Sequence, residues 1–169
     1  MLLEDFKKMV LPFQNKLYRF ALRLLGTRAE AEDVVQEVFI KAWDRREQLL
    51  DYQNVEAWCM KVTKHMSLDV LKSKHRKFQQ NKSDQDVTNQ ALTPDRQAEV
   101  ADAYAYVHQI IESLPEKQKL VIQLRDVEGY SYQEIADMME ISLSQVKVNL
   151  FRARDKVRKQ LQKAESYGL

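Results

Sequence analysis

The first 25 residues carry apolar side chains at helical spacing, with polar side chains between them. Apolar positions recur every three or four residues, at Phe6, Val10, Phe13, Leu17, Phe20 and Leu24. This spacing places them on one face of a helix, so the pattern predicts a helix with one buried side. Pro12 predicts a break or kink early in it, and Gly26 is placed to end it in a left-handed conformation.

A second helix is predicted to start at Thr27, because Thr27-Arg28-Ala29-Glu30 has the spacing of a capping box. Its expected buried face consists of Ala31, Val34, Val35, Val38, Phe39 and Ala42. The same spacing leaves four polar side chains on the outward face, namely Asp33, Gln36, Glu37 and Lys41.

A third helix is predicted after a loop near residues 50–54. Its apolar positions, at roughly helical spacing, are Val55, Trp58, Val62, Met66 and Val70. The helix runs into the basic stretch 71–77. From Phe78 to about Ala101 the chain is polar, carries Pro94 and has no apolar period, which predicts a flexible linker.

The chain beyond the linker is again predicted to be helical. Apolar residues of the first helix are Tyr104, Val107, Ile110 and Ile111, and Leu114-Pro115 precedes another helix that stops at Gly129. Ser131 and Glu134 form a second capping box, which opens a short helix through Met138. After a turn at residues 140–142 comes a last helix, whose apolar stripe is Leu143, Val146, Leu150 and Ala153. Helix, short turn and helix together are typical of a helix-turn-helix unit.

These elements predict an all-α protein of two small helical domains, residues 1–77 and 102–169, joined by a linker at 78–101. The composition agrees: of 169 residues, 44% are hydrophobic and 31% charged, and there are only three Gly and three Pro. We expect no signal peptide or membrane span, because no run of about 18 uncharged apolar residues occurs. One cysteine allows no internal disulfide framework, and the three histidines lack metal-ligand spacing. We therefore expect a cytoplasmic protein without a metal or other cofactor.

The net charge is only +2, but basic and acidic residues are concentrated in different stretches of the chain. Residues 60–82 contain seven Lys or Arg and one Asp, and residues 141–163 contain seven and one. Residues 83–140 contain four basic residues and twelve acids. Solvated helix faces also carry charge, but two separated basic blocks on helical stretches favour contact with the phosphates of a nucleic acid.

The outward face of the last helix has the side chains that read DNA bases. In a helix-turn-helix unit the second helix enters the major groove, and its outward N-terminal residues meet the base edges. Here these residues are Ser144, Gln145, Lys147, Val148, Asn149 and Arg152, which include partners for adenine, guanine and the thymine methyl group. Further along, Arg154, Lys156, Arg158 and Lys159 are expected to contact phosphates. Two alternatives stay open: Gln145 closes a capping box with Ser142, or the helix pair docks onto another protein.

Three ordered motifs resemble a known family. Residues 113–158, SLPEKQKLVIQLRDVEGYSYQEIADMMEISLSQVKVNLFRARDKVR, look like region 4 of the extracytoplasmic-function (ECF) sigma factors of bacterial RNA polymerase. AEDVVQEVFIKAW, residues 31–43, resembles the region 2 helix that holds core polymerase. AWCMKVTKHMSLDVLKSKHRK, residues 57–77, resembles the segment that reads and melts the −10 element.

The resemblance implies a role for each block: region 4 reads the −35 element, and the outward residues 33–41 dock onto core RNA polymerase. The −10 and melting surface would consist of Trp58, Lys61, Lys64, His65, Lys72, Lys74, Arg76 and Lys77. Core polymerase, promoter DNA and an anti-sigma factor are the implied partners. Trp58 also fits the apolar period as a core residue. The chain departs from the common family pattern at Glu140, where Gly is usual, at His65, where Asn is common, and at Asn149, where Arg is frequent.

The sequence thus predicts an ECF sigma factor, a non-catalytic subunit, since no nucleophile motif or glycine-rich phosphate loop occurs. One alternative is a conventional helix-turn-helix regulator with an N-terminal sensing or dimerisation module. A regulator of this kind would give no function to the second basic block or to the outward face at 33–41. Another is an adaptor that only sequesters polymerase, which would not need the outward residues 144–152.

Overall fold

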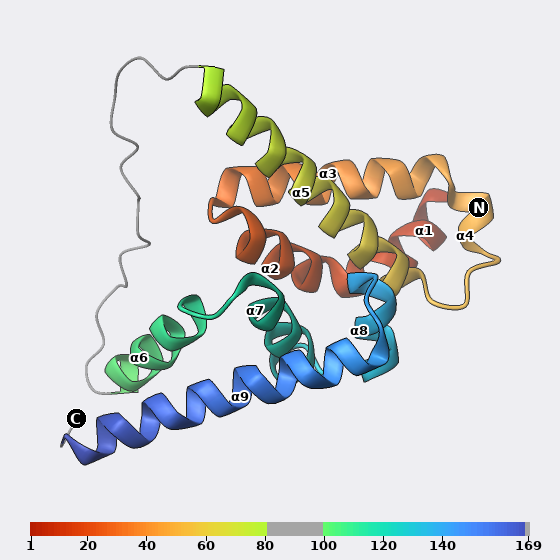
Figure 1. The fold of residues 1–169 in the computed structure, drawn as a ribbon. Coiled ribbons are helices and arrows are strands. Elements are labelled where there is room, and N and C mark those ends of the chain that lie inside the picture. Colours follow the sequence, from red (N-terminus) through yellow and green to blue (C-terminus); the bar gives the residue numbers. More distant parts are fainter. Residues whose placement is uncertain (81–99, 168–169) are drawn as a thin grey trace. The chain divides into compact units, whose positions relative to one another are not determined.

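The computed structural model describes residues 1–80 and 100–167, and every regular element in these ranges is helical (Figure 1). The prediction of an all-α fold is confirmed for this part of the chain. Contacts group the described residues into two units. The first contains residues 1–80 together with Tyr130–Ile141, and the second contains the remainder. The predicted linker lies mostly outside the described residues, and the sequence-based domain limits stay a prediction.

The first unit is built around three packed helices. Its elements are α1 (Leu3–Val10), a 3-10 turn (Leu11–Phe13), α2 (Gln14–Leu25), α3 (Arg28–Asp44), α4 (Arg46–Leu49), α5 (Val55–Gln80) and α8 (Tyr132–Met139). α2 packs against α3 and α5, and α5 also contacts α3 and α8. The break near Pro12 is confirmed by the 3-10 turn, and Gly26 ends α2 with a left-handed φ of 78°. α5 continues through Gln80, past the predicted start of the linker.

The core of the first unit confirms the predicted faces of the first two helices. Buried apolar side chains include Phe6, Val10, Phe13, Leu17, Phe20, Leu24, Ala31, Val34, Val35, Val38 and Ala42. Phe39 is only partly buried.

The predicted third helix is present as α5, but its apolar positions do not mark its most buried side. Val55, Trp58, Val62, Met66 and Val70 are only partly buried, whereas Cys59, Met60, Thr63, Lys64 and Ser67 are buried. α5 is covered by α2 and α3 and also by α8, so burial does not follow one apolar stripe.

The predicted capping box at Thr27 was also wrong. Thr27 precedes α3 as its N-cap but makes no side-chain bond to the helix backbone. Its hydroxyl instead donates to Oε2 of Glu30 at 2.7 Å. That carboxylate also binds Lys74 of α5, at 2.5 Å. The contact with a distant helix therefore replaces the local cap.

The second unit contains α6 (Val100–Glu112), α7 (Glu116–Ile122), a π-helical segment η2 (Gln123–Val127) and α9 (Leu143–Ser166). α9 packs against α6 and α7. Gly129 ends the η2 region with a φ of 81°, as predicted. Tyr104 was expected on the buried face but is 76% exposed. Two residues along a helix lie on nearly opposite sides, and it is Tyr106 whose hydroxyl reaches α9, at the carbonyl oxygen of Gln160.

Across the described ranges, every helix is too short or too polar to pass through a membrane.

Candidate nucleic-acid and polymerase interface

The start of α9 is fixed by its capping box. The backbone N–H of Gln145 donates to Oγ of Ser142 at 3.1 Å, and the N–H of Ser142 donates to Oε1 of Gln145 at 2.9 Å. The capping role weighed for Gln145 is therefore present. It occupies the amide oxygen and leaves the amide nitrogen of this exposed side chain as a donor.

The outward face of α9 is largely exposed, as the sequence predicts. Ser144, Lys147, Val148 and Arg152 are exposed, and Asn149 is partly buried. The side chain of Asn149 donates to the carbonyl oxygen of Gln145 at 2.8 Å, within its own helix.

Sequence reasoning missed Phe151, whose side chain is 70% exposed on the same helix. The signal for it was its position outside the apolar stripe, three residues after the exposed Val148. Val148, on the same helix, is also exposed, at 45%.

Three of the four predicted phosphate contacts of α9 are in ion pairs, and the fourth, Lys156, donates to the carbonyl oxygen of Ser113 at 3.3 Å. Arg154 binds Asp126 of η2 through Nε at 3.0 Å and Nη2 at 2.5 Å. Arg158 and Lys159 both bind Asp155, at 2.6 and 2.7 Å. Hydrogen bonds from Lys159 and Arg158 lower the pKa of Asp155 below its ordinary value. Exposed pairs of this kind are weak, so a phosphate can compete for these cations.

The predicted outward face of α3 is accessible, and its role in polymerase docking stays a prediction. Asp33, Gln36, Glu37 and Lys41 are all exposed. The sequence analysis did not include Ile40, which is 55% exposed beside Lys41.

The C-terminal half of α5 presents exposed cations. Lys72, Arg76 and Lys77 are exposed, and Lys74 is ion-paired with Glu30. Burial opposes ionisation of Glu30, but hydrogen bonds from Lys74 and Thr27 keep its pKa below its ordinary value.

Trp58 near the start of α5 is partly buried. Its ring lies 5.9 Å from the ring of Tyr52, tilted by 46°. The side chain thus has both a packed and an accessible part.

Three predicted DNA contacts of α5 converge on one carboxylate. Lys61 Nζ lies 3.1 Å from Oε1 of Glu140, while Lys64 Nζ and His65 Nε2 lie 2.9 and 2.6 Å from Oε2. We call Lys61, Lys64 and His65 the basic trio. Hydrogen bonds from His65, then Lys64 and Lys61, lower the pKa of Glu140 to about 2. Lys64 is nearly buried here, with 8% of its side chain exposed.

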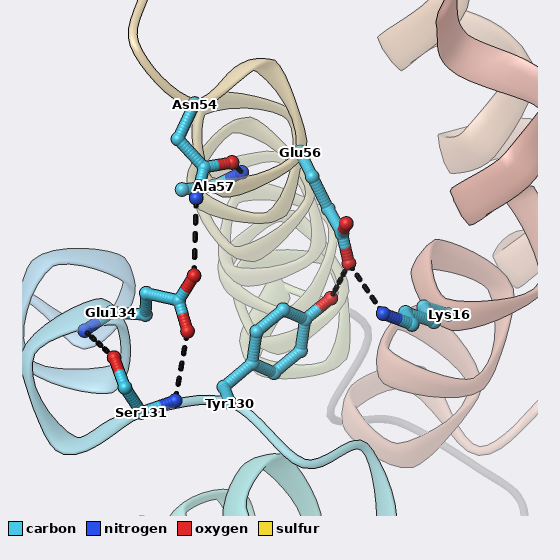
Figure 2. Close-up of polar contacts among 7 residues, drawn as sticks. All are labelled: Lys16, Asn54, Glu56, Ala57, Tyr130, Ser131 and Glu134. Carbon is cyan, nitrogen blue, oxygen red and sulfur yellow. Dashed lines mark hydrogen bonds and ion pairs between the residues drawn. The ribbon is translucent and has the colours of Figure 1, made fainter.

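The segment 130–141, which we call the docked segment, also contacts the start of α5 (Figure 2). The hydroxyl of Tyr130 donates to Glu56, which accepts a second bond from Lys16 of α2 at 2.8 Å. The side chain of Asn54 donates to Oε1 of Glu134 at 3.2 Å. The sequence did not reveal these contacts, because they join residues 40 to 80 positions apart.

Among the described residues no cluster of His, Cys, Asp and Glu is arranged to hold a metal ion.

Two family models match most of the chain. The Sigma-70 region 2 model matches residues 9–77, and the Sigma-70, region 4 model matches residues 104–157. The ECF RNA polymerase sigma factor SigL of Mycobacterium tuberculosis is 33% identical over 147 residues, which cover 86% of this chain and 82% of SigL. The chain belongs to the ECF sigma factors.

Further comparisons agree with this assignment. RNA polymerase sigma-H factor of Pseudomonas aeruginosa is 31% identical over 170 residues, covering 93% of this chain and 86% of that protein. The fold is similar to that of the sigma factor RpoE of Bartonella quintana, solved with the anti-sigma factor NepR. That match has a TM-score of 0.78 and 22% identity, and it covers 95% of this chain and 98% of RpoE.

This ECF sigma factor directs promoter-specific initiation of transcription by RNA polymerase. Its region 4 match includes the docked segment, which the structure groups with the first unit. The element order expected of a helix-turn-helix is present along the chain: α8, a three-residue connection, and α9.

Proposed function

We propose that this ECF sigma factor recognises the promoter through two helix surfaces and binds core polymerase through a third. The outward face of α9 reads the −35 element, and the basic surface of α5 binds and opens the −10 element. The outward face of α3 docks onto core polymerase. The protein contributes binding energy and no catalytic group, and it works in the cytoplasm, where the polymerase and the genome are.

The observation that carries this proposal is that the chain has two basic surfaces on two different helices. One lies on α5 within the region 2 match, and the other lies on α9 within the region 4 match. Exposed cations track phosphates without sequence preference, whereas side chains at the N-terminal end of a groove-bound helix read bases. Two such surfaces fit a ligand with two separated elements better than the single operator site of a conventional regulator.

Within α9 we assign base reading to Lys147 and Arg152 and thymine-methyl contact to Val148 and Phe151. The two cations are exposed and have no ion-pair partner among the described residues, so both are available to guanine. The two apolar side chains are exposed, at 45% and 70%, on the same helix. Gln145 retains its amide donor for DNA while its oxygen caps the helix.

Opening of the DNA duplex at α5 requires cations along the DNA backbone and room for unstacked bases. The exposed Lys72, Arg76 and Lys77 supply the cations, and the accessible part of Trp58 lies near the start of the same helix.

An anti-sigma factor is a further proposed partner. Similarity to RpoE of Bartonella quintana, whose structure contains NepR, supports it.

The test is in vitro transcription with core polymerase and a genomic promoter library, with sequencing of transcript 5′ ends. We expect initiation at a defined set of promoters that share two spaced elements. Transcripts whose start sites are the same with and without the protein would contradict the proposal. A conventional regulator would bind DNA in the absence of polymerase and would not restore initiation by the core enzyme.

A further inference from the structure

The basic trio of α5 is occupied in this structure by a carboxylate of the same chain. Glu140 accepts from all three side chains, at 2.6 to 3.1 Å, in an arrangement that resembles several donors surrounding one phosphate. Its side chain is 42% exposed, so the cluster lies at the surface, where a nucleic acid can reach it.

Glu140 adopts a left-handed backbone conformation, which is unfavourable for residues that have a side chain. Its φ of 57° and ψ of 45° make it the one non-glycine residue with positive φ among those described. Left-handed backbone costs about 1–2 kcal/mol for a residue with a Cβ. Strain of this kind persists where surrounding contacts compensate it, and such positions are often functional. The contacts with Lys61, Lys64 and His65 are a compensation that glycine could not provide.

The rest of the docked segment is held at a second point. The phenol of Tyr130 is 5% exposed, and Lys16 lies 4.9 Å above its ring while also binding Glu56. The Asn54 side chain accepts from the N–H of Ala57 in α5 and donates to Glu134 in α8 (Figure 2). The segment is thus fastened at its beginning, through Tyr130 and Glu134, and at its end, through Glu140.

We infer that the docked segment is an intramolecular cover of the −10 surface, in which Glu140 occupies the place of a DNA phosphate. Single-stranded DNA and Glu140 then compete for the same basic trio, so DNA binding at α5 releases the segment and a closed segment weakens DNA binding. This inference rests on the proposed −10 role of α5. It adds that part of region 4 restrains that role until nucleic acid displaces it.

The test uses the full chain and two measurements. Hydrogen–deuterium exchange of backbone amides in residues 132–139 reports release of the segment, and fluorescence anisotropy with a labelled single-stranded oligonucleotide reports binding. Glu140→Gln removes the charge and keeps the side-chain size. Asp137→Asn, on the exposed side of α8, removes the same charge without a contact to α5. Tyr130→Phe loosens the other end of the segment without changing any charge.

Relative to Asp137→Asn, we expect Glu140→Gln to speed exchange in α8 and to tighten DNA binding about three- to thirtyfold, because the contacts of Glu140 with Lys61, Lys64 and His65 are weakened. Tyr130→Phe should act in the same direction with a smaller effect. Oligonucleotide added to the wild-type protein should speed exchange in α8, because competition is reciprocal.

Equal behaviour of Glu140→Gln and Asp137→Asn in both measurements would overturn the inference, as would slower exchange in α8 when DNA binds. Faster exchange in Glu140→Gln with no DNA binding by any variant would instead refute the −10 role of α5, and with it the competition. Circular dichroism identifies a variant that fails to fold, in which case Tyr130→Phe decides the question.

Discussion

Neutralising two pairs of cations on α9 is expected to have different consequences. Lys147 and Arg152 are exposed near the N-terminal end, with no ion-pair partner in the described part of the chain. Arg158 and Lys159 lie farther along and share the carboxylate of Asp155. We expect the first pair to set sequence preference and the second to add affinity for any DNA.

The magnitudes follow from these surroundings. Loss of one bidentate contact between Arg152 and guanine should cost about 1–3 kcal/mol, or about five- to 150-fold, at the matching promoter only. Removing Arg158 and Lys159 should flatten the slope of log K against log salt by at most about 1.8, since each phosphate contact contributes about 0.9. Both cations also bind Asp155, which offsets part of their charge, so we expect a value below about 1.8.

The assay is binding of the polymerase holoenzyme to promoter fragments at several salt concentrations, with matched and mismatched −35 elements. Lys147→Ala with Arg152→Ala should reduce the preference for the matched element. Arg158→Ala with Lys159→Ala should weaken binding to both fragments equally and flatten the salt dependence. Equal effects of the two double variants on both fragments would refute the separation into base readers and phosphate contacts.

Asp33→Ala with Glu37→Ala should weaken binding of core polymerase in a pull-down titration while circular dichroism stays unchanged, because both side chains are exposed on α3; unchanged affinity would remove this face from docking. The pKa of Glu140, followed by NMR of its carboxyl group, should be about 2 and should rise toward 4.5 in Lys64→Ala. Since this pKa is lowered on folding, the contribution of Glu140 to stability is present above pH 4.5 and is lost as the pH falls toward 2. Met60→Ala should reduce the free energy of unfolding by about 2–5 kcal/mol, because the side chain is fully buried; a urea titration that gives less than about 1 kcal/mol would show that the core closes over the gap.

Local signals in the sequence predicted most of the helices. Pro12 and Gly26 act through their own backbone geometry, and the Ser131 and Ser142 caps involve residues three positions apart. Such features depend little on the rest of the fold, so the sequence alone is enough to locate them.

The errors lie where distant elements meet. The apolar pattern of α5 does not mark its buried residues, and this helix contacts α2, α3 and also α8, which follows it by more than 50 residues. Thr27 makes no capping bond to the backbone of α3; its hydroxyl donates to the Glu30 carboxylate, which also binds Lys74 of α5.

The candidate site shows the same division. Exposure of the outward faces of α3 and α9 follows from helical periodicity alone. The convergence of the basic trio on Glu140 depends on the packing of α8 against α5. The local sequence of neither helix predicts this packing.

The most direct test of the division between the two promoter elements is permanganate footprinting of unpaired thymines in the polymerase–promoter complex, with Lys64→Ala and His65→Ala combined in the full chain. The account predicts that this variant still forms the closed complex, because −35 contacts come from α9, but leaves the −10 thymines unreactive. Normal reactivity of these thymines would contradict the assignment of strand opening to the α5 surface.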